Sequence, residues 1–233
     1  MTDQKIYRIA GISGLASIFT CFIEFPFYFV RTNVPGLSES SKYPDYAARN
    51  ATNIMSCVFL DLIILALLMI FFAGIRHLIR KGNPQHEWLA SLFFGVGLVF
   101  VTITFVSDSF QGTIVIDAFD PPANGAIMRA LTESMLLLYG SIALWLLAFF
   151  MVILSYVTQQ SSILPRWSAW VGYACALIEL AYVPTMFVHH VDFFGWYNPA
   201  CLGAEAFANS IPLFVWTIVI GILMIRKREP VRA

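Results

Sequence analysis

Apolar residues are concentrated in six blocks of at least 20 residues, separated by short segments that carry most of the polar residues. A helix of 20 residues spans about 30 Å, which matches the hydrocarbon core of a bilayer. A lone strand would leave its backbone groups unsatisfied in lipid, so each block predicts a helix. The sequence therefore predicts an all-α, polytopic membrane protein with six transmembrane helices in a single domain, residues 1–233. The predicted spans are Arg8–Val30, Ala51–Ile75, Glu87–Val115, Met128–Thr158, Trp167–Val188 and Ala206–Ile225.

Lysine and arginine residues indicate how the six spans are oriented. With a cytoplasmic amino terminus, ten of the fourteen basic residues fall on the cytoplasmic side. The outer side then holds only Arg31, Lys42, Arg49 and Arg129. Cytoplasmic loops carry such an excess, so we expect both termini to be cytoplasmic.

Composition agrees with a membrane protein and excludes other classes. The chain is 59% hydrophobic and 12% charged, against about 25% charged residues in soluble domains. Its net charge is zero and it has no basic run, which excludes a nucleic-acid binder. No cysteine pair has CxxC spacing and no recognised metal or cofactor motif is present, so we predict no cofactor. We expect an integral protein of an inner, plasma or endomembrane, with membrane lipids as partners.

Acidic residues show the most informative pattern. One candidate acid belongs to each span, and on the predicted topology all six candidates lie in the outer half of the membrane. A charge inside a bilayer costs at least ~2.5 kcal/mol, so such side chains turn towards partners or water. The pattern predicts an outward-facing polar cavity. The six acids are Glu24, Asp61, Asp108, Glu133, Glu179 and Glu205.

Several of these acids have simpler explanations. Glu205 begins the last span, where an acid suits the helix dipole. Glu133 follows Arg129 by four residues, so the two could form a local ion pair. Asp108 lies between two serines and could be hydrated near the interface. Local pairing does not account for Asp61 or Glu179, which have no basic residue within a helical turn.

Asp61, Glu179 and Glu24 are therefore the predicted catalytic acids. A carboxylic acid held neutral in an apolar site is a usable proton donor. His189 and His190 follow the fifth span and could relay protons at the mouth of the cavity. Their spacing matches no zinc motif, so we predict no metal site, and a merely polar interface is the alternative.

Aromatic residues bear on the class of ligand. The chain has 21 Phe, nine Tyr and six Trp residues, most of which would face lipid or pack inside the bundle. Those lining the cavity would suit an amphiphile such as a lipid, isoprenoid or sterol, or stabilise a carbocation. The predicted substrate-binding residues are Asp108, Glu133, Trp145, Tyr182 and Trp216.

Three functions fit these features. The first is a pocket for a hydrophobic small molecule, catalysing an acid–base isomerisation or cyclisation if it is an enzyme. The second is a proton- or cation-coupled transporter, for which we would expect further acids in the inner half or helices broken at mid-membrane. The third is a non-catalytic regulatory membrane protein in which the acids pair locally.

Two short motifs resemble a known group of proteins. Arg8-Ile9-Ala10-Gly11-Ile12 opens the first span, and Ile163-Leu164-Pro165-Arg166-Trp167 leads into Trp170-Val171-Gly172-Tyr173. The chain resembles an uncharacterised family of bacterial six-helix membrane proteins, defined only as a domain of unknown function. The resemblance implies six spans and implies no activity and no catalytic residues.

Overall fold

A computed structural model describes residues 2–31, 35–36, 39–120, 122–161, 163–183 and 204–227 of the chain. All secondary structure in this part is helical. The helices are α1 (Asp3–Phe29), α2 (Tyr43–Gly82), α3 (Glu87–Ala118), α4 (Gly125–Leu137), α5 (Ala143–Gln160), α6 (Arg166–Tyr182) and α7 (Ala204–Arg226). Short 3₁₀ segments precede α2 and α3, at Ser40–Lys42 and Pro84–His86, and a π-helical segment, Leu138–Ile142, joins α4 to α5.

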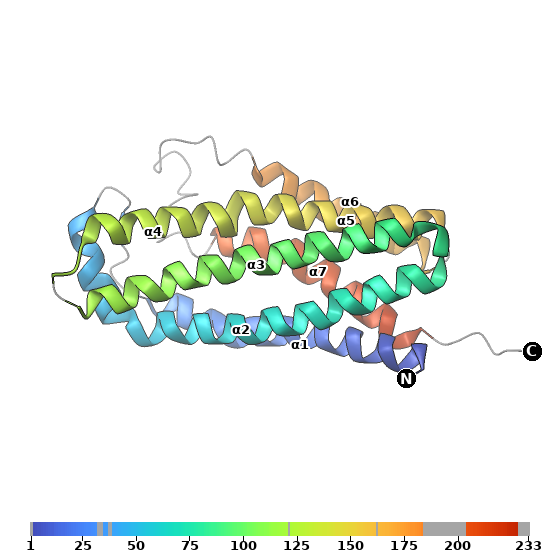
Figure 1. The fold of residues 1–233 in the computed structure, drawn as a ribbon, viewed down its shortest axis with the longest axis horizontal. Helices are drawn as coiled ribbons and strands as arrows, with labels where there is room; N and C mark the ends of the chain where they lie inside the picture. Colours follow the sequence, from blue (N-terminus) through green and yellow to red (C-terminus); the bar gives the residue numbers. More distant parts are fainter. Residues whose placement is uncertain are drawn as a thin grey trace, which may run out of the picture.

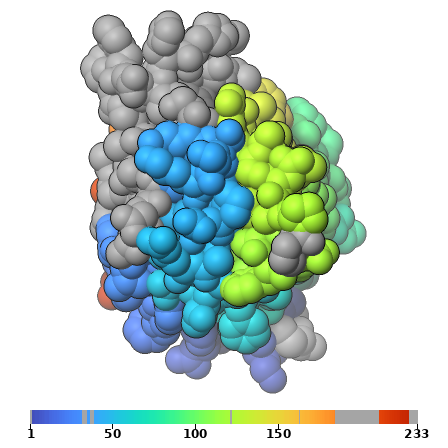
Figure 2. All heavy atoms as spheres, turned by 90° about the vertical axis from the view of Figure 1, so that its left-hand side faces the viewer, coloured from blue at the N-terminus to red at the C-terminus, as the bar shows by residue number. Residues whose placement is uncertain are grey.

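The helices form an elongated bundle in which consecutive rods run in opposite directions (Figure 1). Helices α4 and α5 follow one another along a single rod that is kinked at the π-helical segment, so the described residues form six rods. Helix α2 packs between α1 and α3, α5 packs between α3 and α6, and α7 closes the bundle against α1 and α6. The start of α1 and the end of α7 lie at the same end, which we call the terminal end (Figure 1). At the opposite end, the first turns of α2 lie beside the α3–α4 region (Figure 2).

Four of the rods are long and apolar enough to cross a membrane: Asp3–Phe29, Ser40–Gly82, Pro84–Ala118 and Gly125–Gln160. The chain is thus an all-helical protein with the helices of a membrane protein. Helix α6 has 17 described residues, and Ser210–Arg226 in α7 is a shorter apolar stretch. Six spans and cytoplasmic termini stay predictions.

Several predicted spans were shorter than the observed helices, because they left out the polar helix ends. Helix α2 begins at Tyr43, eight residues before the predicted Ala51, and continues to Gly82. Its first turns contain Asp45 and Arg49, which form an ion pair at 3.6 Å across one turn. Hydropathy detects the apolar centre of such a helix and not its amphipathic ends. Residues 184–188 of the predicted fifth span lie outside the described residues.

The core of the bundle is built around an aromatic cluster formed by Phe71, Phe72, Phe93, Phe150 and Trp216. The ring of Phe150 lies 5.1 Å from that of Phe72 and 5.2 Å from that of Trp216, in tilted arrangements. All five side chains are almost completely buried. Tilted and edge-on ring pairs are favourable, so this cluster holds α2, α3, α5 and α7 together.

Small residues allow α1, α2 and α7 to approach closely near the terminal end. A Cβ atom added at Gly74 would clash with the Cβ atom of Ala10, and one added at Gly11 would meet the backbone of Gly221. Helices in membranes commonly pack through such small residues, because no water is released to drive association.

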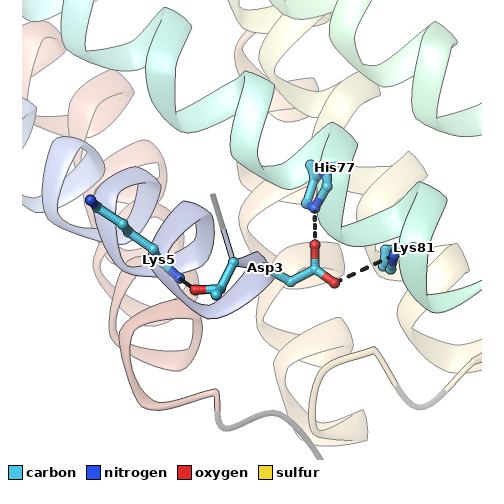
Figure 3. Close-up of polar contacts among 5 residues, drawn as sticks. Asp3, Lys5, His77 and Lys81 are labelled. Carbon is cyan, nitrogen blue, oxygen red and sulfur yellow. Dashed lines mark hydrogen bonds and ion pairs between the residues drawn. The ribbon is translucent and has the colours of Figure 1, made fainter.

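Charged side chains form ion pairs between the helices at the terminal end. His77 Nε2 lies 2.9 Å from one carboxylate oxygen of Asp3, and Lys81 Nζ lies 3.6 Å from the other (Figure 3). Arg80 pairs with Glu87 at 3.1 Å, across the α2–α3 turn. These ion pairs place several basic side chains near the end of α2 at the terminal end.

Candidate functional site

A cavity of about 180 Å³ lies inside the bundle, between the aromatic cluster and the end opposite the termini. Residues from α1, α2, α3, the α4–α5 rod, α6 and α7 line it. Its wall is mostly aliphatic and aromatic, and its polar groups come from acids, tyrosines, hydroxyls, Gln111 and Arg31. The cavity is the part of the described structure that best fits a small-molecule site, because pockets of this kind combine apolar walls with a few converging polar groups.

Three acids from three different helices meet at this cavity. Glu24 lies in α1, Asp61 in α2 and Asp108 in α3, and their side chains are 5%, 7% and 6% exposed. The carboxyl groups of Glu24 and Asp61 face each other within hydrogen-bonding reach. Asp108 is close enough to both to interact with them electrostatically. Three of the six acids selected from the sequence therefore line the same cavity.

A second polar group lies beside the carboxyl pair, towards the α1–α2 connection. The hydroxyl of Tyr28 is hydrogen-bonded to Glu24. The Arg31 guanidinium lies 4.2 Å above the Tyr28 ring and is hydrogen-bonded to Tyr46 and Cys57. Cation–π contact and two polar neighbours hold this arginine at the wall, and it is the basic residue that lines the cavity.

The α4–α5 rod is broken where it passes the cavity. Gly140 has φ −81° and ψ −112°, a non-helical conformation inside the π-helical segment Leu138–Ile142. Gly140 and Ser141 line the cavity, and a Cβ atom added at Gly140 would have no neighbour within 4 Å. Two hydrogen bonds from α3 reach the α4 side of this break: Ser107 Oγ donates to Met135 O at 3.2 Å and Gln111 Nε2 to Met135 Sδ at 3.2 Å. Such π segments often occur at functional sites.

The remaining predicted site residues lie elsewhere, with one exception. Tyr182 lines the cavity. Glu133 is on the surface and forms an ion pair with Arg129 at 2.8 Å, the local pairing considered as its alternative. Trp145 is 48% exposed on the outside of α5, and Trp216 belongs to the aromatic cluster, so neither lines the cavity.

Glu179 is a separate case. Its side chain on α6 is completely buried, and neither carboxylate oxygen has a hydrogen-bond partner within the described structure. It does not line the cavity. His189 and His190 lie outside the described residues, as does the side chain of Glu205.

Residues that the sequence analysis did not select complete the site. Tyr28 and Arg31 follow Glu24 by four and seven positions, and Gln111 follows Asp108 by three. Residues at these intervals lie on one face of a helix. A search for polar residues on the same helix face as each acid could therefore have found them. No sequence signal marks Gly140, because glycines are common in membrane helices.

No metal centre is found in the described part of the chain, which contains no group of three His, Cys, Asp or Glu side chains suited to hold an ion. Cys21, Cys57 and Cys175 are free thiols, and Cys201 lies outside the described residues. Comparisons with protein-family models, curated proteins and solved structures gave no match to this chain. The resemblance to bacterial six-helix proteins therefore stays a prediction, and the functional argument depends on the geometry of the cavity.

Proposed function

We propose that this protein is a six-span integral membrane protein whose cavity binds a hydrophobic small molecule, of lipid, isoprenoid or sterol type. The observation that carries this proposal is that Glu24, Asp61 and Asp108 line one cavity whose remaining wall is largely apolar and aromatic. An apolar wall suits the body of such a molecule, while the acids suit a polar or reacting group.

The distribution of charge supports an outward-facing cavity. Basic side chains gather at the terminal end, among them Arg76, Arg80 and Lys81. Membrane proteins keep such residues on the cytoplasmic side. The cavity is displaced from this end, towards the α1–α2 and α3–α4 connections. In this orientation its ligand would enter from the outer side or from the outer leaflet.

The carboxyl pair is suited to acid–base chemistry. Two carboxylates at hydrogen-bonding distance repel each other unless one proton is shared between them. Protonated Asp61 could transfer this proton to one carbon of a double bond, forming a carbocation, while Glu24 stabilises the charge. Asp108 would then take a proton from the carbon on the other side of the cationic centre and return it to the pair. The double bond is thereby moved by one position with no net change in protons. The tyrosine rings of the wall would stabilise the cation.

A proton- or cation-coupled transporter is the second candidate, because one observation favours it. Transporters bind substrates and ions near breaks in their helices. The α4–α5 rod is broken at Gly140, and prolines interrupt the hydrogen-bonding pattern inside α1 at Pro26 and inside α7 at Pro212. Gly140 lines the cavity, and Pro26 is two positions from Glu24.

Native mass spectrometry of the purified protein tests the first candidate. Wild type should retain an organic mass, and Asp61→Asn should lose it. Glu133→Gln is the matched control, because Glu133 is an acid on the surface of the same bundle. Glu179→Gln is a second control, a buried acid outside the cavity.

A mass that all four proteins retain would show that the ligand binds elsewhere. If no variant and not even wild type retains an organic mass, the hydrophobic ligand is rejected in favour of transport. Proton flux into liposomes that contain the protein would then be measured, and Asp61→Asn should abolish it.

A further inference from the structure

Hydrogen-bond acceptors without partners are concentrated at one part of the cavity wall. Asp108 Oδ2, Gln111 Oε1 and Glu24 Oε1 are buried and have no hydrogen-bond partner within the described structure. All three side chains line the cavity and are more than 90% buried. Gln111 is one helical turn from Asp108, so the two acceptors lie on the same face of α3. A buried acceptor left without a donor costs free energy, which a bound ligand can recover.

Four of the hydroxyl groups in the cavity wall do not supply the missing donors. Four serine and threonine side chains of the wall each donate their hydrogen to a main-chain carbonyl at 2.7–3.2 Å, which leaves only lone pairs towards the cavity. They are Ser17, Thr104, Ser107 and Thr132. The Gln111 amide donates to Met135 Sδ, and the Tyr28 hydroxyl is hydrogen-bonded to Glu24.

Among the buried side-chain donors of the described wall, those without a hydrogen-bond partner belong to the outermost part of the cavity. They are Nε and Nη2 of Arg31 and the hydroxyl of Tyr43, at the end of α1 and the start of α2. The buried atoms left without a partner at Asp108 and Gln111 are therefore acceptors, and the described lining of the cavity contains three carboxyl groups and one guanidinium. The unpartnered acceptors favour a ligand that donates hydrogen bonds, and the excess of carboxyl groups favours a ligand with a positive charge.

We propose that the polar group of the ligand is a protonated primary or secondary amine, whose N–H groups donate to Asp108 and Gln111 while its apolar part lies along the aliphatic and aromatic wall. This inference rests on the proposed function, because it names the chemical class of the molecule that the cavity takes. An alkylammonium ion supplies up to three donors and one positive charge in a small volume. A neutral alcohol supplies one donor without charge, and a quaternary ammonium ion supplies charge without donors.

Three probes with the same alkyl chain separate these requirements: octylamine, 1-octanol and octyltrimethylammonium. Binding to the protein in lipid nanodiscs would be measured by titration calorimetry at pH 7, with empty nanodiscs as the reference for partition into lipid. We expect octylamine to bind at least about tenfold more tightly than either analogue, since a hydrogen bond to a charged group is worth that factor or more. Asp108→Asn and Gln111→Met should each weaken octylamine about tenfold, and Glu133→Gln should leave its affinity unchanged.

The possible failures are distinguishable. If 1-octanol binds as tightly as octylamine, the positive charge is not required for binding. If octyltrimethylammonium binds as tightly as octylamine, the N–H donors are not required for binding. Either result overturns the amine while leaving the hydrophobic pocket in place. If none of the probes binds and wild type also retains no organic mass, both this inference and the proposed function fail. If none binds but wild type retains a mass that Asp61→Asn loses, only the amine is wrong.

Discussion

The carboxyl groups of Glu24 and Asp61 face each other within hydrogen-bonding reach, although they come from different helices and both side chains are more than 90% buried. A pair of like charges in this position does not stabilise a fold. The hydroxyl of Tyr28 relieves it through a hydrogen bond to Glu24, and Arg31 relieves it through its charge. Groups that cost stability and yet lie together in a cavity are typical of functional sites.

Asp61→Asn should therefore make the protein more stable while it removes ligand binding. The new amide can donate to Glu24, so the pair no longer needs a shared proton. We expect a gain of about 1–3 kcal/mol, the usual penalty for a polar group that is left unsatisfied. For a chain of this size each kcal/mol corresponds to about 2–4 °C in Tm. Thermal unfolding followed by tryptophan fluorescence would measure it, and a lower Tm for the variant would contradict a mainly functional role for the pair.

Gly140→Leu should fill the cavity without unfolding the bundle. The backbone at Gly140 has a negative φ, and an added Cβ atom meets no neighbour within 4 Å because the residue faces the cavity. We expect the Tm to change by less than about 4 °C, since no packed contact is disturbed. The organic mass seen by native mass spectrometry should be lost. Retention of that mass at the wild-type level would mean that the ligand does not occupy the space beside the helix break.

Gly74→Ala should destabilise the protein, because the new methyl group clashes with Ala10 where α1 and α2 pack against each other. Overpacking of this kind costs about 1–3 kcal/mol. Gly95→Ala is the matched control, since Gly95 is an exposed helical glycine with no neighbour within 4 Å. Alanine there should stabilise the helix by about 0.5–1 kcal/mol. Equal Tm values for the two variants would show that α1 and α2 are packed less closely at Gly74 than in the structure.

The connection before α2 should loosen at low pH. Lys42 beside Glu39 and the Gly36 N–H, which donates to Glu39 at 3.1 Å, hold the pKa of Glu39 below its usual value of 4.5. The stabilising contribution is thus complete above pH 4.5 and is lost as the pH falls through the lowered folded-state value. Hydrogen exchange at the Gly36 amide, corrected for intrinsic rates, should show protection at pH 6 that is lost at a pH well below 4.5. Glu39→Gln should show the same exchange at both pH values, and a pH-dependent change that persists in this variant would assign the effect to another group.

The sequence predicted where helices occur and at what depth the acids lie, but not how each helix is rotated. In a soluble helix the polar face shows the rotation, whereas in these spans both faces are apolar. Glu24, Asp61 and Asp108 turn towards one cavity, while Glu133 at a similar predicted depth turns outwards to Arg129. Glu179 is buried away from the cavity. Its neighbours in the sequence are apolar, and they would be equally apolar if its side chain entered the cavity, so the sequence could not distinguish the two positions.

Some features of the site depend on contacts between segments that are distant in the sequence. Arg31 is an ordinary interfacial arginine by position, and only the approach of α2 brings Tyr46 and Cys57 to its guanidinium. The break at Gly140 is equally unmarked in the sequence, since the apolar pattern continues through it from Met128 to Thr158. Aromatic residues were misleading for a related reason: Trp216 completes a core of phenylalanine rings and does not line the cavity.

The aromatic cluster also has an electrical consequence. Phe100 lines the cavity and lies against Phe150, whose ring contacts Trp216, so the tightly packed rings begin where the cavity ends. Across a membrane, voltage falls mainly over material of low dielectric constant and little over a polar, hydrated space. With the terminal end in the cytoplasm and the cavity open to water on the outer side, as proposed, most of the potential would fall across these rings. Protons at Glu24 and Asp61 would then equilibrate with the outer solution. Their binding would depend very little on the membrane potential.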